Sequence, residues 1–120
     1  MTVRRMKTYT GGQGYVYQYY FVGKRPALAS VPEDPATEFI FDVTSDRKTV
    51  FSVSVLLPDS ATRAWNASHS RQLTDAEQYG AVKMRLFQAF DDIENLQAEG
   101  RTLRMDADDL ATLLTHLGVD

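Results

Sequence analysis

The sequence of 120 residues contains no cysteine. Disulfide bonds, thiolate nucleophiles and sulfur-ligated zinc or iron sites are therefore excluded, and packing has to stabilise the fold. Histidine is also scarce, because His69 and His116 are the only two and neither has an acid or cysteine at ligand spacing. A metal site needs more ligands than this. The sequence predicts no metal site and no cofactor.

Long apolar runs are also missing. No run approaches the roughly 20 residues that span a membrane, and no apolar stretch follows the basic start as it would in a secretory signal. Apolar residues make up 43% and charged residues 24% of the chain, as in ordinary globular proteins. We therefore expect a single domain over residues 1–120, located in the cytoplasm and without a membrane partner.

Catalytic and nucleotide-binding motifs are absent as well. The glycine-rich segment Gly11-Gly12-Gln13-Gly14 precedes a predicted strand, whereas a phosphate-binding loop would open a helix. Ser52 and Ser54 have no histidine nearby in sequence, and hydroxyls without an activating base are poor nucleophiles. We therefore assign no catalytic residue and expect a protein that is not an enzyme.

Acidic residues are missing from the first 25 positions. The basic residues of that segment are Arg4, Arg5, Lys7, Lys24 and Arg25. Because glycines follow the first three, a flexible basic arm is predicted over residues 1–13. The net charge of the whole chain is −3, which disfavours duplex DNA as a partner. One hypothesis is that this arm binds the acidic cluster Asp91, Asp92 and Glu94 of a second subunit.

Four of the six tyrosines lie between positions 15 and 20. Aromatic and β-branched residues are typical of strands, so the first strand is predicted over residues 15–22. Alternate residues make both of its faces largely apolar, and an apolar strand without cover tends to associate with another chain. The candidate interaction surface consists of Tyr15, Tyr17, Tyr19, Tyr20, Lys24 and Arg25.

Two further strands are predicted over residues 38–44 and 48–57, joined as a hairpin. Placing Val43 opposite Phe51 gathers the apolar side chains on one face, whereas a shift by one residue would pair apolar with polar positions. Residues 23–37 contain three prolines, which lack the backbone N–H that regular pairing requires. This segment is predicted to be a surface loop.

Helical patterns follow the strands. Thr74-Asp75-Ala76-Glu77 matches a capping box, and an apolar stripe behind it predicts a long helix over residues 75–97, about 35 Å in length. A short helix capped by Asp59 or Ser60 is expected before it. A final helix, capped by Asp106, is expected to end at Gly118.

The order of these elements predicts an α+β fold. It consists of a three-stranded antiparallel sheet, a meander, with helices packed on one face. Residues 101–105 fit either a loop or a short edge strand.

The sequence favours a small intracellular, non-enzymatic interaction or adaptor module that self-associates through its aromatic strand. The contact is expected at the outer sheet face or at the strand edge. The partner is a second copy or another protein. A competing interpretation is that the loop over residues 23–37 covers that face instead.

Two other functional interpretations remain open. One is a small-ligand pocket between the sheet and the long helix, lined by Trp65, Tyr79 and Phe87. The other is stacking of single-stranded nucleic acid on the aromatic strand. The missing RNA-recognition signature and the three strands before any helix disfavour nucleic acid.

Overall fold

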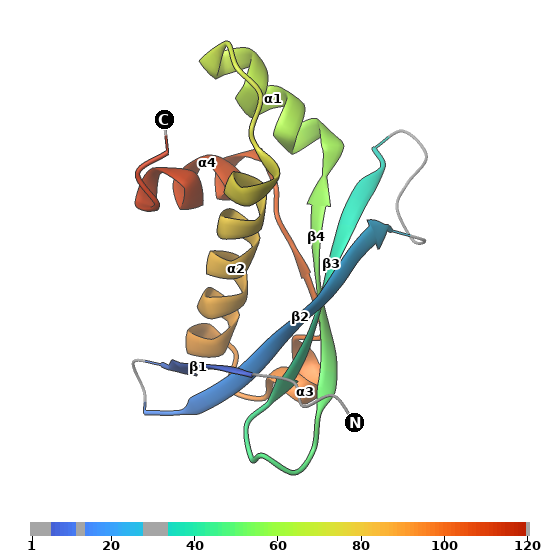
Figure 1. Ribbon diagram of the computed structural model, residues 1–120, viewed down its shortest axis with the longest axis vertical. Helices are drawn as coiled ribbons and strands as arrows, with labels where there is room; N and C mark the ends of the chain where they lie inside the picture. Colours follow the sequence, from blue (N-terminus) through green and yellow to red (C-terminus); the bar gives the residue numbers. More distant parts are fainter. Residues whose placement is uncertain (1–5, 12–13, 28–33, 120) are drawn as a thin grey trace.

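The computed structural model describes residues 6–11, 14–27 and 34–119. These residues form an α+β fold in which helices lie on one side of a five-stranded sheet (Figure 1). The strands are β1 (Lys7–Thr10), β2 (Val16–Pro26), β3 (Ala36–Thr44), β4 (Phe51–Pro58) and β5 (Thr102–Arg104). The helices are α1 (Asp59–His69), α2 (Asp75–Asp92), α3 (Leu96–Glu99) and α4 (Ala107–His116).

The sheet is larger than the predicted three-stranded antiparallel meander and is mixed. Its strand order is β1-β2-β3-β4-β5, and β5 pairs parallel with β4 while the other pairs are antiparallel. The β5 strand resolves the choice that the sequence left open for residues 101–105. Parallel strands are joined by a long crossover, which here contains α1, α2 and α3. The pairing of β5 with β4 therefore cannot be predicted from the alternation of apolar and polar residues within the three residues of β5.

Two further strand boundaries differ from the prediction. Residues 7–10 lie inside the predicted flexible arm over residues 1–13, and they form β1 opposite β2. The loop predicted over residues 23–37 is shorter, because β2 continues to Pro26 and β3 already begins at Ala36. The β2 strand continues past Gly23 through a bulge, since its register with β3 shifts between Phe21 and Gly23.

The predicted hairpin register is confirmed. Val43 lies opposite Phe51, and the pairs Phe41–Val53 and Phe39–Val55 follow along β3 and β4. In the connection, Asp46 Oδ1 accepts the backbone N–H groups of Lys48 and Thr49, both at 2.8 Å. The apolar pattern and the turn chemistry therefore agree on one register.

The predicted capping box of α2 is confirmed. The Glu77 N–H donates to Thr74 Oγ1 at 3.1 Å, and the Thr74 N–H donates to Glu77 Oε1 at 2.9 Å. Arg71 adds two hydrogen bonds to the same carboxylate, at 3.0 and 2.9 Å. These contacts lower the pKa of Glu77 to about 2, with the Arg71 hydrogen bond as the largest cause.

The prediction of an uninterrupted helix over residues 75–97 is wrong for its carboxyl-terminal part, because α2 ends at Asp92. Ile93 has an extended backbone with φ −103° and ψ 111°. The chain then starts again as α3, where the Asn95 side chain accepts the Ala98 N–H at 3.3 Å. This break buries Leu96 in the core, where it is 2% exposed.

The predicted cap of α1 is also different. Neither Asp59 nor Ser60 caps the helix, whose N-cap residue is Pro58. Asp34, distant in sequence, instead accepts hydrogen bonds from the Ser60 N–H at 3.3 Å and the Ser60 hydroxyl at 2.9 Å. By contrast, Asp106 caps α4 as expected and accepts the Asp109 N–H at 2.8 Å.

One main core lies between the sheet and the helices. Its members include Phe39, Phe41, Val43, Val53, Val55, Val82, Leu86, Phe90, Leu103, Leu110, Leu113 and Leu114. Long α2 therefore covers the sheet as the sequence predicted, although it is shorter than expected. Among the helices of the described residues, none combines the length and the apolar character that crossing a bilayer requires.

Candidate functional site

Two of the predicted surface rings lie in the core. Tyr17 and Tyr19 are 4% and 5% exposed. Tyr17 stacks on Phe90 with ring centroids 4.4 Å apart, and Tyr19 meets Phe87 edge to face at 5.5 Å. Burial raises the pKa of both phenols. In the single chain these rings pack against α2, so they are not accessible to a partner or to a nucleic-acid base.

The other four predicted residues are accessible. Tyr15 is exposed and Tyr20 is half-buried, while Lys24 and Arg25 are exposed near the end of β2. Lys24 forms an ion pair with Asp75 at 3.7 Å, across from the start of α2. The sequence-predicted surface is therefore divided between the two faces of the sheet.

Arg25 belongs to a polar network on the outer face of the sheet. Its Nε donates to Glu38 Oε1 at 2.8 Å, and the Ser54 hydroxyl donates to Glu38 Oε2 at 2.6 Å. The hydrogen bond from Ser54, followed by that from Arg25, lowers the pKa of Glu38. This network connects β2, β3 and β4 and satisfies the carboxylate where no helix covers it.

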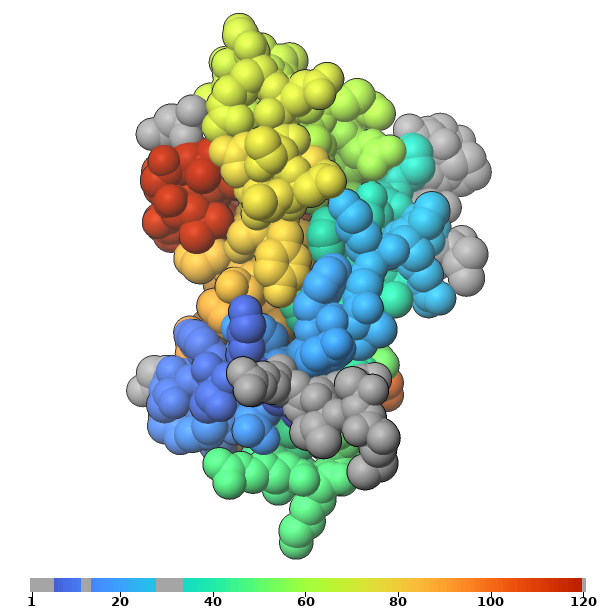
Figure 2. Space-filling model, viewed as in Figure 1, coloured from blue at the N-terminus to red at the C-terminus, as the bar shows by residue number. Residues whose placement is uncertain are grey.

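The accessible part of β2 carries a concentration of exposed apolar side chains. Tyr15, Val16 and Val22 are 51%, 43% and 48% exposed, and among the described residues only Val50 and Leu117 are further large apolar side chains of this kind. We call Tyr15, Val16, Val22, Lys24 and Arg25 the β2 surface. Figure 2 shows the blue side chains of β2 at the molecular surface, beside the yellow start of α2.

The β2 strand also has an open backbone edge. Its pairing with β1 covers only Val16 to Tyr19. From Phe21 to Pro26 it pairs with β3 alone, as far as the described residues show. The bulge at Val22 lies in this segment, and Gly23 there has a φ of 158°, a conformation that glycine tolerates more readily than other residues.

The three residues predicted to line a pocket do not come together. Tyr79 and Phe87 lie on α2 and pack on aromatic rings of the sheet layer, with centroid distances of 4.8 Å from Tyr79 to Phe21 and 4.4 Å from Phe87 to Tyr9. Trp65 lies on α1, stacked on His69 at 3.9 Å. It lines a separate pocket between α1 and α4.

A contact that the sequence did not indicate joins β1 to the end of α2. The Tyr9 hydroxyl donates to Asp91 Oδ2 at 2.7 Å, and this hydrogen bond is the main reason that the pKa of Tyr9 is raised to about 12. The predicted acidic cluster is therefore contacted by the chain's own β1. Arg4 and Arg5, which the hypothesis placed there, lie outside the described residues.

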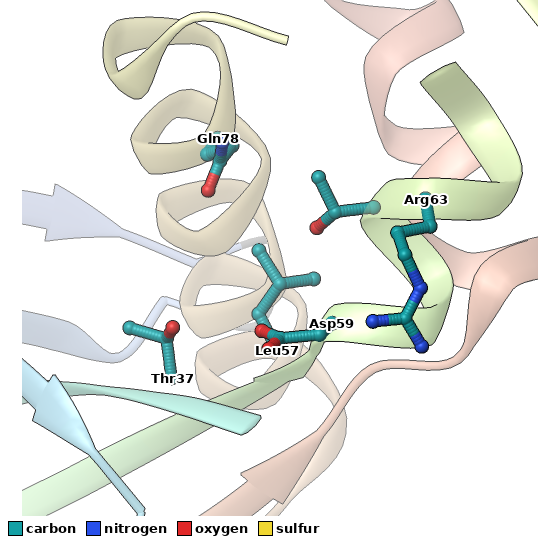
Figure 3. A pocket seen from close by; sticks show the side chains of 6 residues that line it. Thr37, Leu57, Asp59, Arg63 and Gln78 are labelled. Atoms are coloured by element: carbon teal, nitrogen blue, oxygen red, sulfur yellow. The ribbon is translucent and has the colours of Figure 1, made fainter. Parts of the chain in front are cut away.

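A pocket of about 250 Å³ lies where the ends of β3 and β4 meet α1 and α2. We call it the α1–α2 pocket. It is lined by Thr37 of β3, Leu57 of β4, Asp59, Thr62 and Arg63 of α1, and Gln78 of α2 (Figure 3). No sequence motif indicates this pocket, because its lining comes from four elements, with three side chains from α1 and one each from β3, β4 and α2.

No family model matches the sequence, and comparison with curated proteins and with solved structures finds no significant match either. Within the described part of the chain, no three histidine, aspartate or glutamate side chains form a group that could hold a metal ion.

Proposed function

We propose that this protein is a non-enzymatic interaction module that self-associates through the β2 surface. The single observation that carries the proposal is the coincidence of exposed apolar side chains and an open strand edge on the same strand. Tyr15, Val16 and Val22 are about half exposed there, and among the described residues the backbone from Phe21 to Pro26 pairs on one side only.

A second copy of the chain suits this surface for a geometric reason. An open edge offers unpaired backbone N–H and C=O groups to another strand, and two identical edges can meet about a two-fold axis. Such pairing would join two sheets into one and remove Val22 from water. Tyrosine is also enriched in interfaces of this kind.

The face of the sheet opposite the helices would extend the same contact. The helices lie on the other side of the sheet (Figure 1). Tyr20 and Ile40 are half-buried on neighbouring strands of the outer face, and Val50 lies exposed immediately before β4. Polar residues separate these apolar ones, as expected for an interface that forms and dissociates.

Sedimentation velocity over about 1 to 100 µM protein tests the proposal, since this range brackets micromolar dissociation constants. The unmodified chain is expected to sediment increasingly as a dimer. The double variant Val16→Lys and Val22→Lys is expected to remain a monomer, because it replaces two exposed apolar side chains of the β2 surface by charged ones, and Val22 lies beside the open edge. Both positions are exposed, so the thermal unfolding midpoint should change little.

Leu117→Lys is the matched control. Leu117 is also a large apolar residue, 41% exposed, but it lies at the end of α4 in the helix layer. This variant should dimerise like the unmodified chain. A monomer throughout the concentration range, or a dimer that the double variant leaves intact, would contradict the proposal.

A further inference from the structure

The α1–α2 pocket contains two opposite charges that are not paired with any described side chain. Asp59 and Arg63 are one helical turn apart on α1, a spacing at which opposite charges usually pair. They form no ion pair with each other, and no described residue forms a side-chain hydrogen bond or ion pair with either of them. Their carboxylate and guanidinium groups are therefore available to a third molecule.

The rest of the lining complements these two charges. Leu57, which is 2% exposed, provides an apolar floor, and Thr37 and Thr62 contribute hydroxyl groups from opposite sides. The Gln78 side chain donates to the Leu73 carbonyl at 3.4 Å, and its oxygen points toward Leu57 and the pocket (Figure 3). The site thus offers an anion, a cation and neutral hydrogen-bonding groups around a small apolar surface.

The acidic groups of a neighbouring pocket, in contrast, are used in hydrogen bonds of the fold. The neighbour, about 400 Å³, is larger and more acidic, with Asp34, Asp106 and Asp109 in its lining. Each of these carboxylates caps a helix: Asp34 bonds Ser60, and Asp106 and Asp109 bond each other's backbone N–H. Its acidic groups stabilise the fold, whereas Asp59 accepts no such bond.

We propose that the α1–α2 pocket binds a small zwitterionic α-amino acid. Its ammonium group donates to the Asp59 carboxylate, its carboxylate accepts from the Arg63 guanidinium, and its side chain lies over Leu57. A volume of about 250 Å³ is below the usual range for drug-sized ligands, about 300–1,000 Å³, and suits a molecule of this size. A dissociation constant on the order of 1 mM is expected for so few atoms.

The test is a titration of ¹⁵N-labelled protein with each standard free amino acid, followed by NMR. At least one amino acid is expected to produce saturable shifts at the Thr62, Arg63 and Gln78 amides. The N-acetyl and the carboxamide derivatives of that amino acid each lack one charge. Each should bind at least about ten-fold more weakly, because a hydrogen bond between charged groups is lost.

Two variants locate the site. Asp59→Asn and Arg63→Gln should each weaken binding about ten-fold or more, and Arg63 is exposed, so its replacement preserves the folded spectrum. Arg104→Gln, which changes the net charge equally but lies in the neighbouring pocket, should bind like the unmodified chain. The proposal is overturned if no amino acid gives saturable shifts up to about 10 mM, if the derivatives bind equally well, or if Arg63→Gln has no effect.

This test is independent of the one for self-association. Amino-acid binding is measured with the monomeric Val16→Lys and Val22→Lys variant as well, and the same affinity is expected. A result that contradicts self-association therefore does not contradict amino-acid binding, and the reverse also holds.

Discussion

The two halves of β2 differ in sequence and in environment, since the first is rich in aromatic residues and the second contains glycine, proline and two basic residues. In the first half, Tyr17 and Tyr19 lie between β1 and β3 and pack their rings against α2. In the second half, Gly23 to Pro26 pairs among the described residues with β3 alone, and the side chains from Val22 onward are mostly exposed. A run of aromatic and β-branched residues therefore does not by itself identify a binding surface.

The difference has two structural causes. Among the described residues β1 extends only to Lys7, opposite Tyr19, so within them only the first half of β2 has a strand on both sides. The bulge at Val22 then places Lys24 opposite Phe39 on the helix side, where its Nζ lies 5.8 Å from the ring centroid. Charge and exposed backbone are thus concentrated beyond the bulge, and the rings lie before it.

The largest effect that distinguishes the two halves is expected from Phe90→Ala. Phe90 is 2% exposed and packs on Tyr17 at 4.4 Å, so its removal should cost about 3–5 kcal/mol of unfolding free energy. Urea denaturation measures this loss. Val22→Ala in the second half should change the free energy by less than about 0.5 kcal/mol. Similar losses in both variants would show that the halves do not differ in packing.

A smaller effect is expected from Tyr9→Phe, which removes the hydrogen bond between β1 and Asp91. A loss of about 1–1.5 kcal/mol follows for a partly exposed hydrogen bond to a charged acceptor. Folding raises the pKa of Tyr9 from 10.0 to about 12. The contribution is therefore complete below about pH 10 and is lost as the pH rises through about 12.

Urea denaturation of the unmodified protein and of the Tyr9→Phe variant is measured at about pH 8, 10 and 11.5. The series tests whether the difference in unfolding free energy decreases as the pH rises. The pKa values of Tyr17, Tyr19 and Tyr79 are also raised, but both proteins contain these residues, so the difference isolates Tyr9. The stability difference should shrink toward alkaline pH. A difference that grows with pH would be inconsistent with the Tyr9–Asp91 bond.

The smallest effect is expected from Arg25→Gln in the second half of β2. The Arg25 side chain is 56% exposed in its ion pair with Glu38, so less than about 1 kcal/mol should be lost. Because folding lowers the pKa of Glu38, this contribution is present at neutral pH and is lost as the pH falls through the depressed pKa.

Thermal unfolding at low and high salt, and at neutral and acidic pH, measures the Arg25 effect. High salt should reduce it, since exposed ion pairs are screened. Lys48→Gln removes the same charge in the β3–β4 connection, where only the backbone N–H of Lys48 forms the turn contact. If Arg25→Gln resembled this control under all conditions, the ion pair would contribute nothing to stability.

Sequence reasoning succeeded where the information is local. The register of β3 and β4 follows from alternation within two adjacent strands, and the α2 capping box follows from residues three positions apart. Predictions were wrong where residues distant in sequence make the contacts that determine a helix end. Asp34 replaces the expected cap of α1, and the burial of Leu96 accompanies the early end of α2.

The candidate sites show the same division. Tyr15, Lys24 and Arg25 are exposed as the predicted surface requires, but Tyr17 and Tyr19 are buried because α2 presents Phe87 and Phe90 to them. Trp65 was grouped with Tyr79 on apolar character alone, and the fold places them in different pockets. The pattern of apolar residues predicts which side chains are buried, but it does not predict which buried side chains contact each other.

The amino-acid sequence by itself determined the α+β class, the hairpin register and the starts of α2 and α4, since each depends on residues close together in the chain. Only the tertiary structure decided the addition of β1 and β5 to the sheet, the burial of the tyrosines and the lining of the α1–α2 pocket. The physical reason is that these features depend on contacts across many intervening residues. Their geometry is set when α2 packs on the sheet and not by any local pattern.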